Sequence, residues 1–473
     1  MNNEIVNFWN KQKDKILWAK KPKKLLKYKP KGFLWFDDGK LNVAENCIKK
    51  NLDKNLGKKS AIHYIKENGE EYSFTYNDLS NLVFNFSIFL KKKNKTSRPI
   101  FIHSSASIEA TVSMLSAAKL GIKHCVIFEE LENEAISKRL ELINPGILIT
   151  KTSNIKKITY FKKIQKKFKF RLIILNNTKN FIKEFKRNSA TKINYKKNYS
   201  NNELFTLFTS GSTGTPKGII HSSGGYLLYA KLTSIKQFGL TQNKTILCAS
   251  DAGWMNGHTY SLYGPLSIGA TTVLLEKPTI ILNIKKLKNI LVNYKVNILY
   301  LPVTLVRMLK SIRYDLKISS KYLKTLGSMG EPLAASVAKW FSKSFNLRNK
   351  AIVNTYYQTE NGGILFSPTF KEDSSTFGTV GKSFCNKINL NIKKKDNKKE
   401  DLKIKTPWPG CMINVENENT IWEKYWDKDN FFNLFDVGKY DKKNRLLILG
   451  RNDDVINVRG HRIGTSEIEA TIL

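Results

Sequence analysis

The chain has 473 residues, of which 41% are hydrophobic, so it is long enough to bury a large core and to form more than one ordinary domain. It contains no run of about 18 apolar residues and no basic-then-apolar leader at its start, so the sequence predicts neither a membrane span nor a signal peptide and favours a cytoplasmic location. Its 80 Lys and Arg residues against 39 Asp and Glu residues give a formal net charge of +41, which attracts polyanions non-specifically.

The positive charge does not by itself indicate a nucleic-acid-binding protein. The lysines are scattered through a chain rich in Asn and Ile, as in "KKITYFKKIQKKFKF", and zinc-finger spacing and RNP-type aromatic signatures are absent. We therefore predict solvated lysine faces and no specific nucleic-acid partner, and a homo-oligomer remains open. The cysteines have no CxxC spacing, which argues against disulfides and a zinc site and predicts reduced, mostly buried thiols at Cys47, Cys125, Cys248, Cys385 and Cys411.

Strand-like and helix-like runs alternate from the first third of the chain onwards. Residues 98–105 are typical of a strand, 108–122 of a helix and 123–128 of the next strand, which together predict a βαβ unit. Further apolar runs predict strands at 144–150, 170–176 and 271–276. This pattern favours an α/β fold with a parallel sheet that has helices on its faces.

Two Lys- and Asn-rich regions, 153–202 and 393–401, are predicted to be surface segments, although the first contains one short apolar run. After the second region, short strands and a dense charged cluster follow. The last residues, 467–473, have the pattern of an amphipathic helix without a C-terminal cap.

The most specific local pattern is "ELFTLFTSGSTGTPKG", in which an alternating strand at 203–209 leads into a loop of glycines and hydroxyls with Lys217. Such a loop can direct backbone N–H groups and hydroxyls at phosphate oxygens, because glycine allows the backbone to approach closely. A Walker A loop requires glycine before the lysine and Ser or Thr after it, whereas this chain has Pro216 and Gly218. A P-loop NTPase is therefore excluded, and a polar surface turn is the plain alternative.

The ten residues "TSGSTGTPKG" at 209–218 are similar to the phosphate loop of the adenylate-forming (AMP-binding) acyl-CoA synthetases. Four longer stretches follow in the order of the acetyl-CoA and propionyl-CoA synthetase branch: "SDAGWMNGHTYSLYGPLSIGATTVLLE", "LGSMGEP", "YYQTENGG" and "GRNDDVINVRGHRIGTSEIE". The resemblance covers nearly the whole chain. It implies an α/β fold with a large N-terminal adenylate-forming domain, in which mixed sheets are flanked by helices, plus a small β subdomain.

The resemblance also implies a domain division and an activity. Residues 1–452 correspond to the AMP-binding domain, and 453–473 to the hinge, at Asp453, and the start of a C-terminal domain that is truncated relative to the family and lacks its adenylation lysine. Family members are ligases that use ATP and Mg²⁺ to convert a short-chain carboxylate to an acyl-adenylate, release pyrophosphate and pass the acyl group to coenzyme A. The alternative is a nucleotide-binding remnant with little or no complete turnover.

The resemblance assigns site residues by their place in these motifs. It implies four catalytic residues, of which the first and third hold Mg²⁺: Thr209, Lys217, Glu360 and Arg462. It implies nucleotide contacts in the loop at Ser210, Gly211, Ser212, Thr213 and Gly214, and around the adenine, ribose and α-phosphate at Gly330, Glu331, Pro332, Asn354, Tyr356, Gln358, Thr359, Asp436 and Arg451. Gly460 is implied on the coenzyme A face.

The implied acyl pocket consists of Trp254, Met255, Asn256, Met329 and Tyr357. Acetate enzymes typically have tryptophan at the position of Tyr357, threonine at that of Asn256 and valine at those of Met255 and Met329, so space is gained on one side and lost on another. Asn256 and Tyr357 could also hydrogen-bond a polar substituent on the acid. We expect an acid of about two to four carbons, with acetate first, because one methylene is hard to discriminate.

Other departures from the family pattern concern the nucleotide and the acceptor. Asn354 replaces an aspartate that meets the adenine, and its carbonyl can still accept a hydrogen bond. The stretch "FEELENEA" at 128–135 replaces glycines and a serine, which leaves part of the coenzyme A entrance in question. We interpret His258 as structural rather than as a general base, because a carboxylate substrate is already deprotonated at neutral pH.

Overall fold

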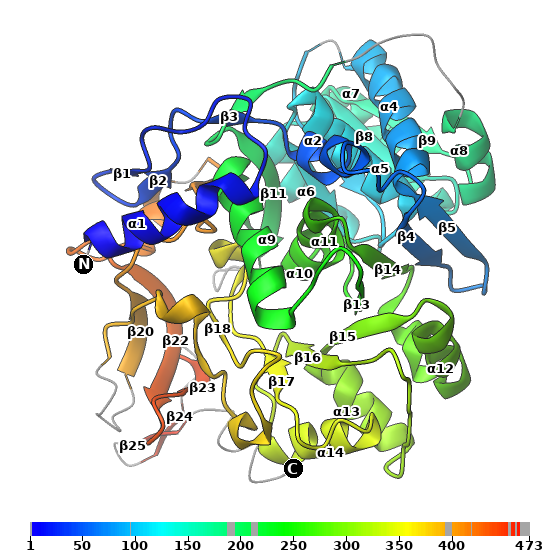
Figure 1. The fold of residues 1–473 in the computed structure, drawn as a ribbon. Coiled ribbons are helices and arrows are strands. Elements are labelled where there is room, and N and C mark those ends of the chain that lie inside the picture. The colour runs from blue at the N-terminus through cyan, green and yellow to red at the C-terminus, as the bar shows by residue number, and fades with distance from the viewer. Residues whose placement is uncertain are drawn as a thin grey trace.

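The computed structural model describes residues 2–94, 96–186, 194–209, 216–392, 400–417, 419–452, 456–458 and 461–463. Its architecture is α/β: two seven-stranded mixed sheets lie with helices on their faces, and a third, smaller antiparallel sheet stands beside them, at the lower left of Figure 1. The predicted fold class of mixed sheets flanked by helices is confirmed.

The first sheet contains the βαβ unit predicted from the sequence. Its strand order is β21-β12-β11-β7-β6-β8-β9, and the four strands from β7 to β9 are parallel, as are β11 and β7. In chain order its strands are β6 (Ile100–His103), β7 (His124–Ile127), β8 (Ile147–Lys151), β9 (Arg171–Leu175), β11 (Glu203–Thr209), β12 (Lys217–Ser222) and β21 (Asn414–Val415).

The second sheet has the order β17-β16-β15-β13-β14-β4-β5, with only the edge strand β5 antiparallel to its neighbour. Its strands are β4 (Ser60–Ile65), β5 (Glu71–Thr75), β13 (Thr245–Cys248), β14 (Thr271–Leu275), β15 (Val296–Pro302), β16 (Thr325–Met329) and β17 (Ile352–Asn354). The third sheet joins β20 (Glu400–Ile404), β22 (Phe432–Tyr440) and β23 (Leu446–Arg451). Beyond it, β24 (Ile456–Val458) pairs with β25 (His461–Ile463).

The helix α5 (Ile108–Leu120) illustrates why the predicted helices form. Ser107 caps its N-terminus by accepting a hydrogen bond from the N–H of Ala110, and Gly121 ends it with a positive φ of 66°. The helix is buried along its whole length, which explains its apolar, small-residue sequence. It contacts α2 (Val43–Cys47) and α4 (Tyr76–Lys93), while α9 (Gly224–Phe238) contacts α11 (Gly264–Ile268).

The remaining long helices flank the sheets (Figure 1). They are α1 (Asn2–Gln12), α6 (Asn133–Ile143), α7 (Ile155–Phe168), α8 (Thr178–Phe185), α12 (Ile284–Asn293), α13 (Val303–Ile312) and α14 (Ala335–Ser344). Within the described part of the chain, none of the helices is both long and apolar enough to cross a membrane.

The prediction of a surface segment at 153–202 was too simple. This region holds α7, the edge strand β9 and α8, and it covers one end of the first sheet. Lysine density concealed the helix α7, in which Phe161 is buried while most of its lysines are exposed. The helix predicted at 467–473 lies outside the described residues.

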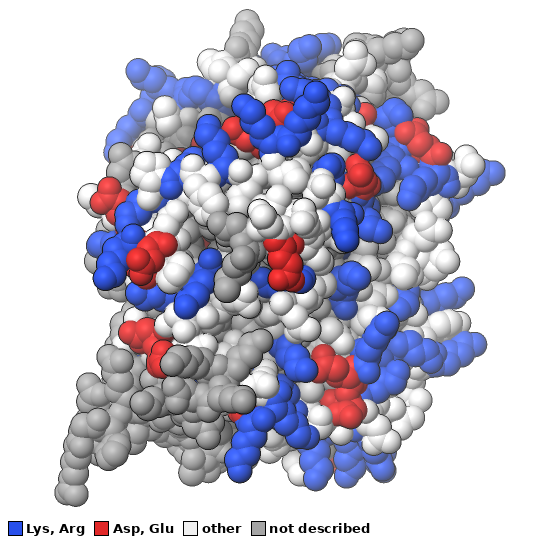
Figure 2. All heavy atoms as spheres, turned by 60° about the vertical axis from the view of Figure 1, so that its left-hand side comes forward, with Lys and Arg blue, Asp and Glu red and all other residues white. Residues whose placement is uncertain are grey.

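The lysines and arginines are distributed over the face drawn in Figure 2, with acidic side chains interspersed among them. This arrangement agrees with the interpretation of solvated lysine faces. The cysteines are free, and all but the partly buried Cys385 are buried, as predicted.

A buried ion pair fixes the antiparallel edge of the first sheet. The Nζ atom of Lys123 lies 2.6 Å from Oε1 of Glu416 and 2.8 Å from Oε2 of Glu203. Thr206 on β11 also donates to Glu416, at 2.6 Å. Lys123 directly precedes β7, and Thr206 lies on β11. Glu416, which follows β21, therefore connects these two strands to the edge of the sheet formed by β12 and β21.

We expect Lys123→Met to lower the free energy of unfolding by about 3–5 kcal/mol, because it leaves the carboxylate of Glu416 buried without its charged partner. The matched control is Lys138→Met, which removes an ion pair with Glu134 in which both side chains are more than half exposed. Urea denaturation followed by circular dichroism measures both changes. Equal midpoints for the two variants would contradict this account of the pair.

Candidate active site

A cavity of about 430 Å³ opens where the second and third sheets meet. Its wall comes from segments that follow the carboxyl ends of β13, β16 and β17 and from β22 and β23, which is the edge where parallel α/β sheets place their ligands. It brings together these residues predicted from the sequence: Trp254, Met255, Asn256, Gly330, Glu331, Pro332, Tyr356, Tyr357, Gln358, Thr359, Asp436 and Arg451.

Five other predicted residues that the structure describes do not line this cavity: Thr209, Lys217, Met329, Asn354 and Glu360. Met329 and Asn354 are buried behind its wall, and Glu360 is buried beside it. Thr209 and Lys217 face each other across the β11–β12 hairpin that carries the predicted phosphate loop. Arg462 belongs to β25, but its side chain is outside the described part of the structure, as are Ser210, Gly211, Ser212, Thr213, Gly214, Asp453 and Gly460.

Asp436 on β22 is the most constrained polar group of the cavity. The hydroxyl of Tyr356 donates to its Oδ2 at 2.6 Å and the amide of Gln358 donates to the same atom at 2.7 Å. Arg451, its partner across the β22–β23 ladder, places Nη1 3.8 Å from Oδ1. Burial nevertheless dominates and raises the pKa of Asp436 to about 6, against the lowering effect of these partners.

The opposite end of the cavity is closed by hydroxyl and amide groups. The hydroxyl of Tyr357 donates to Oδ1 of Asn256, and the hydroxyl of Tyr300 lies 3.3 Å from the same oxygen. Tyr300 also exchanges a 2.7 Å hydrogen bond with Thr355. Because Tyr357 packs edge-on against Tyr260 at 5.9 Å, the aromatic wall is fixed from both sides.

The side-chain amide of Asn354 forms hydrogen bonds within the protein. Its Oδ1 accepts from Ser328 at 3.0 Å and its Nδ2 donates to the carbonyl of Thr379 at 2.9 Å. Since Asn354 is buried away from the cavity lining, these bonds give it a structural role in holding the segment after β17. Its contact with a nucleotide stays a prediction that the geometry does not favour.

Glu360 is buried, and the hydroxyl of Tyr425 donates to its Oε1 at 2.6 Å. The Nζ atom of Lys217 lies 5.8 Å from the centre of the Tyr425 ring, so this tyrosine connects the hairpin to the carboxylate. Burial and the adjacent Glu360 both raise the pKa of Tyr425, which remains a neutral donor. The sequence analysis missed Tyr425, because it follows the short helix α15 (Asn419–Lys424) outside the recognised motifs.

Four more cavity residues were missed: Thr355, Val380, Ile448 and Gly450. Thr355 directly precedes the recognised stretch "YYQTENGG" and Gly450 begins the stretch "GRNDDVINVRGHRIGTSEIE", so the sequence could have indicated both. Val380 and Ile448 belong to no recognised motif. His258 is buried and outside the cavity lining, and burial lowers its pKa to about 3. It is therefore neutral, in line with a structural role.

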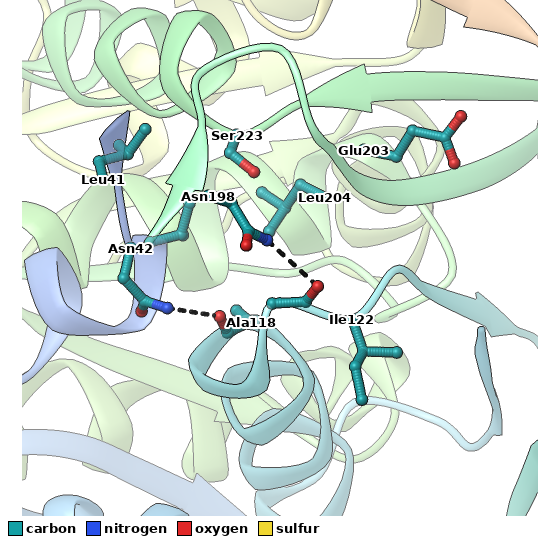
Figure 3. A pocket seen from close by; sticks show the side chains of 10 residues that line it. Leu41, Asn42, Ala118, Ile122, Asn198, Glu203, Leu204 and Ser223 are labelled. Atoms are coloured by element: carbon teal, nitrogen blue, oxygen red, sulfur yellow. Dashed lines mark hydrogen bonds between the residues drawn. The ribbon is translucent and has the colours of Figure 1, made fainter. Parts of the chain in front are cut away.

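A small cavity near the end of α5, drawn in Figure 3, is too small for an organic ligand. It measures about 10 Å³, the space of one water molecule, between the end of α5 and the segments around Asn42 and Asn198. These two amides bond the carbonyls of Ala118 and Gly121, at 2.9 and 3.1 Å. This small cavity is a packing feature of the helix end.

Together, the fold and the cavity define an α/β enzyme with its site at the carboxyl ends of parallel strands. The chain belongs to the family of AMP-binding enzymes, whose model matches residues 49–410, and the model of the acetyl-coenzyme A synthetase N-terminus matches residues 2–47.

Relatives support this assignment. The chain is 31% identical to the acetyl-coenzyme A synthetase of Helicobacter pylori (strain P12), over 100% of this chain and 77% of the relative. It is 32% identical to that of Campylobacter jejuni (strain 81116), over 99% and 77%. Among solved structures, the acetoacetyl-CoA synthetase from Streptomyces lividans superposes with a TM-score of 0.86 at 16% identity, covering 99% of this chain and 76% of that one, which shows the shared fold.

We expect Asp436→Asn to stabilise the protein at neutral pH. In the folded protein the pKa of Asp436 is about 6, above the ordinary value of 3.8, so the native state holds the carboxyl proton more tightly than the unfolded state does. The free energy of unfolding therefore falls as the pH rises towards 6. Asparagine cannot ionise, and its stability advantage over the wild type should be about 1 kcal/mol larger at pH 8 than at pH 5.

Urea midpoints at both pH values measure this difference, with Asp429→Asn, at an exposed position, as the control. A pH-independent difference between Asp436→Asn and the wild type would show that burial does not control this carboxyl.

Proposed function

We propose that this protein is an AMP-forming ligase that activates a short-chain carboxylic acid with ATP and transfers the acyl group to coenzyme A. The observation that carries the proposal is the two-ended cavity. One end has the ribose-type acid Asp436 with Arg451 and the loop 330–332, and the other has the small aromatic wall of Tyr357. A carboxylate bound at the second end would share one cavity with the α-phosphate of a nucleotide bound at the first end.

The nucleotide end has groups suited to each part of AMP. In this proposal Asp436 accepts hydrogen bonds from the ribose hydroxyls, with Arg451 nearby, and Tyr356 provides an aromatic face for the adenine. Gly330 and Pro332 are exposed and leave room for the base, while Arg307 on α13 holds Glu331 at 3.1 Å. Thr359, on the same cavity wall as the acid pocket, is proposed to contact the α-phosphate.

Attack of one anion on another requires positive charge at the transferring phosphorus. We assign this role to Lys217 and Arg462 and, for the β- and γ-phosphates, to the backbone of loop 210–214. A buried carboxylate and a hydroxyl are hard oxygen ligands, so Glu360 and Thr209 fit Mg²⁺, which takes its other ligands from phosphates and water. Bound Mg²⁺ would screen the phosphate charges.

The acid end supports a small substrate. Trp254, Met255, Asn256 and Tyr357 line it, with Met329 behind the wall, and the hydroxyl of Tyr357 is occupied by Asn256. We propose acetate or a similar acid of about two to four carbons, because such walls discriminate single methylenes weakly. The domain assignment belongs to the same proposal: 1–452 as the AMP-binding domain, and 453 onwards as hinge and C-terminal domain, with Gly460 on the coenzyme A face.

The test is acid-dependent exchange of labelled pyrophosphate into ATP with Mg²⁺, across acetate, propionate, butyrate, lactate and 3-hydroxypropionate. We expect robust exchange with at least one short acid, which identifies the substrate, and thioester formation when coenzyme A is added. ATP binding without any exchange would instead support a nucleotide-binding protein that does not turn over.

The acid preference tests the pocket. Tyr357→Trp should shift it towards the shortest acid, with kcat/KM for propionate relative to acetate falling about 10-fold, because the larger ring fills the space of one methylene. Tyr357→Phe keeps the size and removes the hydroxyl, so it should leave the ratio nearly unchanged for unsubstituted acids. An unchanged ratio in Tyr357→Trp would remove Tyr357 from the acyl pocket.

A further inference from the structure

Another cavity, of about 400 Å³, shares no lining residue with the candidate active site, and of its lining residues only Glu276 belongs to a stretch that resembles the family. It opens between the two large sheets, where strands from both end. Lys151 ends β8, Asn176 follows β9, Glu276 follows β14 and Lys66 follows β4.

The topology marks this edge as a place where ligands bind. In the first sheet, β6 lies between β7 and β8, and the chain leaves β6 through α5 to β7 on one side and later returns to β8 on the other. Such a reversal of strand order opens a crevice at the carboxyl ends of the two strands. Glu109, in the first turn of α5, and Lys151, at the end of β8, come from its two sides and both line the cavity.

The charges inside the cavity are unbalanced. Lys151 is 9% exposed, and its Nζ lies 3.1 Å from Glu129, 3.8 Å from Glu276 and 3.2 Å from the hydroxyl of Ser105. Glu276 also accepts hydrogen bonds from the hydroxyl of Tyr64 and the backbone N–H of Glu67, at 3.2 and 2.9 Å. Two carboxylates thus already neutralise the buried ammonium.

Glu109 is the third carboxylate of this group, and it lies in the first turn of α5, where the helix dipole favours a negative charge. It is 1% exposed, it lines the cavity, and its Oε2 has no hydrogen-bond partner among the described residues. A buried carboxylate without a partner is costly and is normally paired. In a chain of net charge +41, with lysines available throughout, a buried carboxylate oxygen without a hydrogen-bond donor at a cavity wall points to a partner that the chain itself does not supply.

We propose that this cavity binds a small organic cation with a primary ammonium group, which donates hydrogen bonds to Glu109. An ammonium matches the chemistry, because it carries one charge and up to three N–H donors. The lining also holds neutral hydroxyls and amides, which suit a ligand with further hydroxyl or amide groups: Asn68, Thr152, Ser153, Asn176, Asn177 and Thr178. Its two other charged residues, Lys66 and Glu67, are paired with Glu70 and Lys277, at 2.8 and 2.9 Å. Among the described residues, no group of three or more His, Cys, Asp or Glu side chains forms a metal site.

The test compares apparent melting temperatures of the purified full chain in ethanolamine, putrescine, ammonium, potassium and tetramethylammonium chlorides at equal ionic strength. Equal ionic strength is essential, because the basic surface responds to screening alone. We expect ethanolamine or putrescine to raise the melting temperature of the wild type by about 1–3 °C over tetramethylammonium, which has no N–H donor.

Glu109→Gln separates binding from folding. It removes a desolvated charge, so its melting temperature without ligand should equal or exceed that of the wild type, while the shift caused by the amine should disappear. Glu184→Gln, at an exposed position on α8, is the control and should keep the shift. If Glu109→Gln does not fold, Thr152→Trp at the exposed rim tests the site, because it fills the entrance and leaves Glu109 in place.

Three results would overturn the proposal. One is the absence of an amine-specific shift in the wild type, and another is an equal shift in the wild type and in the cavity variants. The third is a shift with potassium that matches or exceeds that with the amines, which would assign the cavity to an inorganic ion.

Discussion

The geometry of the candidate active site depends on one buried carboxylate, that of Asp436. It belongs to the third sheet, but two of its hydrogen-bond donors, Tyr356 and Gln358, follow β17 of the second sheet. A hydrogen bond to an ionised acceptor is shorter and stronger than one between neutral groups, so these contacts hold the small sheet against the large one. The raised pKa of Asp436 is the cost of removing it from water.

The segment that contacts Asp436 also contributes to both ends of the cavity. Asp436 fixes the aromatic ring of Tyr356, and the next residue, Tyr357, points its hydroxyl to Asn256 on the opposite wall. Consecutive side chains of an extended segment point in opposite directions, so one short segment provides both the nucleotide end and the acid end. A change in its backbone would therefore disturb both ends together.

The sequence predicted the architecture well where apolar runs were continuous. Residues 108–122 and 123–128 correspond to α5 and β7, because buried elements of a parallel sheet have unbroken apolar patterns. The sequence did not predict the helix α7, because exposed lysines dominate its pattern and Phe161 is its only buried residue, so the helix resembles a solvated segment. Most described site residues of the long motifs line one cavity, although Met329 and Glu360 do not. Tyr425 was missed because its contacts with Glu360 and Lys217 join elements that are distant in the sequence.

Asn354 shows a further limit of reasoning from single positions. The resemblance assigned it to the nucleotide, which stays a prediction, and only the three-dimensional structure reveals that one acceptor site and one N–H of its amide bond Ser328 and Thr379. The reverse holds for Glu109, which belongs to no assigned site and has an unoccupied oxygen beside a cavity. For a buried polar group, the number of hydrogen bonds it still lacks indicates a ligand more directly than its residue type does.

The same reasoning explains why a net charge of +41 carries little information about function here. Surface lysines are screened by solvent and cost little free energy, so their number can rise without altering the fold. Buried charges cannot vary in this way, because each needs a partner in place of water. Glu416 forms an ion pair with Lys123. Asp436 accepts hydrogen bonds from Tyr356 and Gln358. Each buried acid therefore constrains the fold far more than a surface lysine does, because it needs a defined partner from the chain or from a ligand.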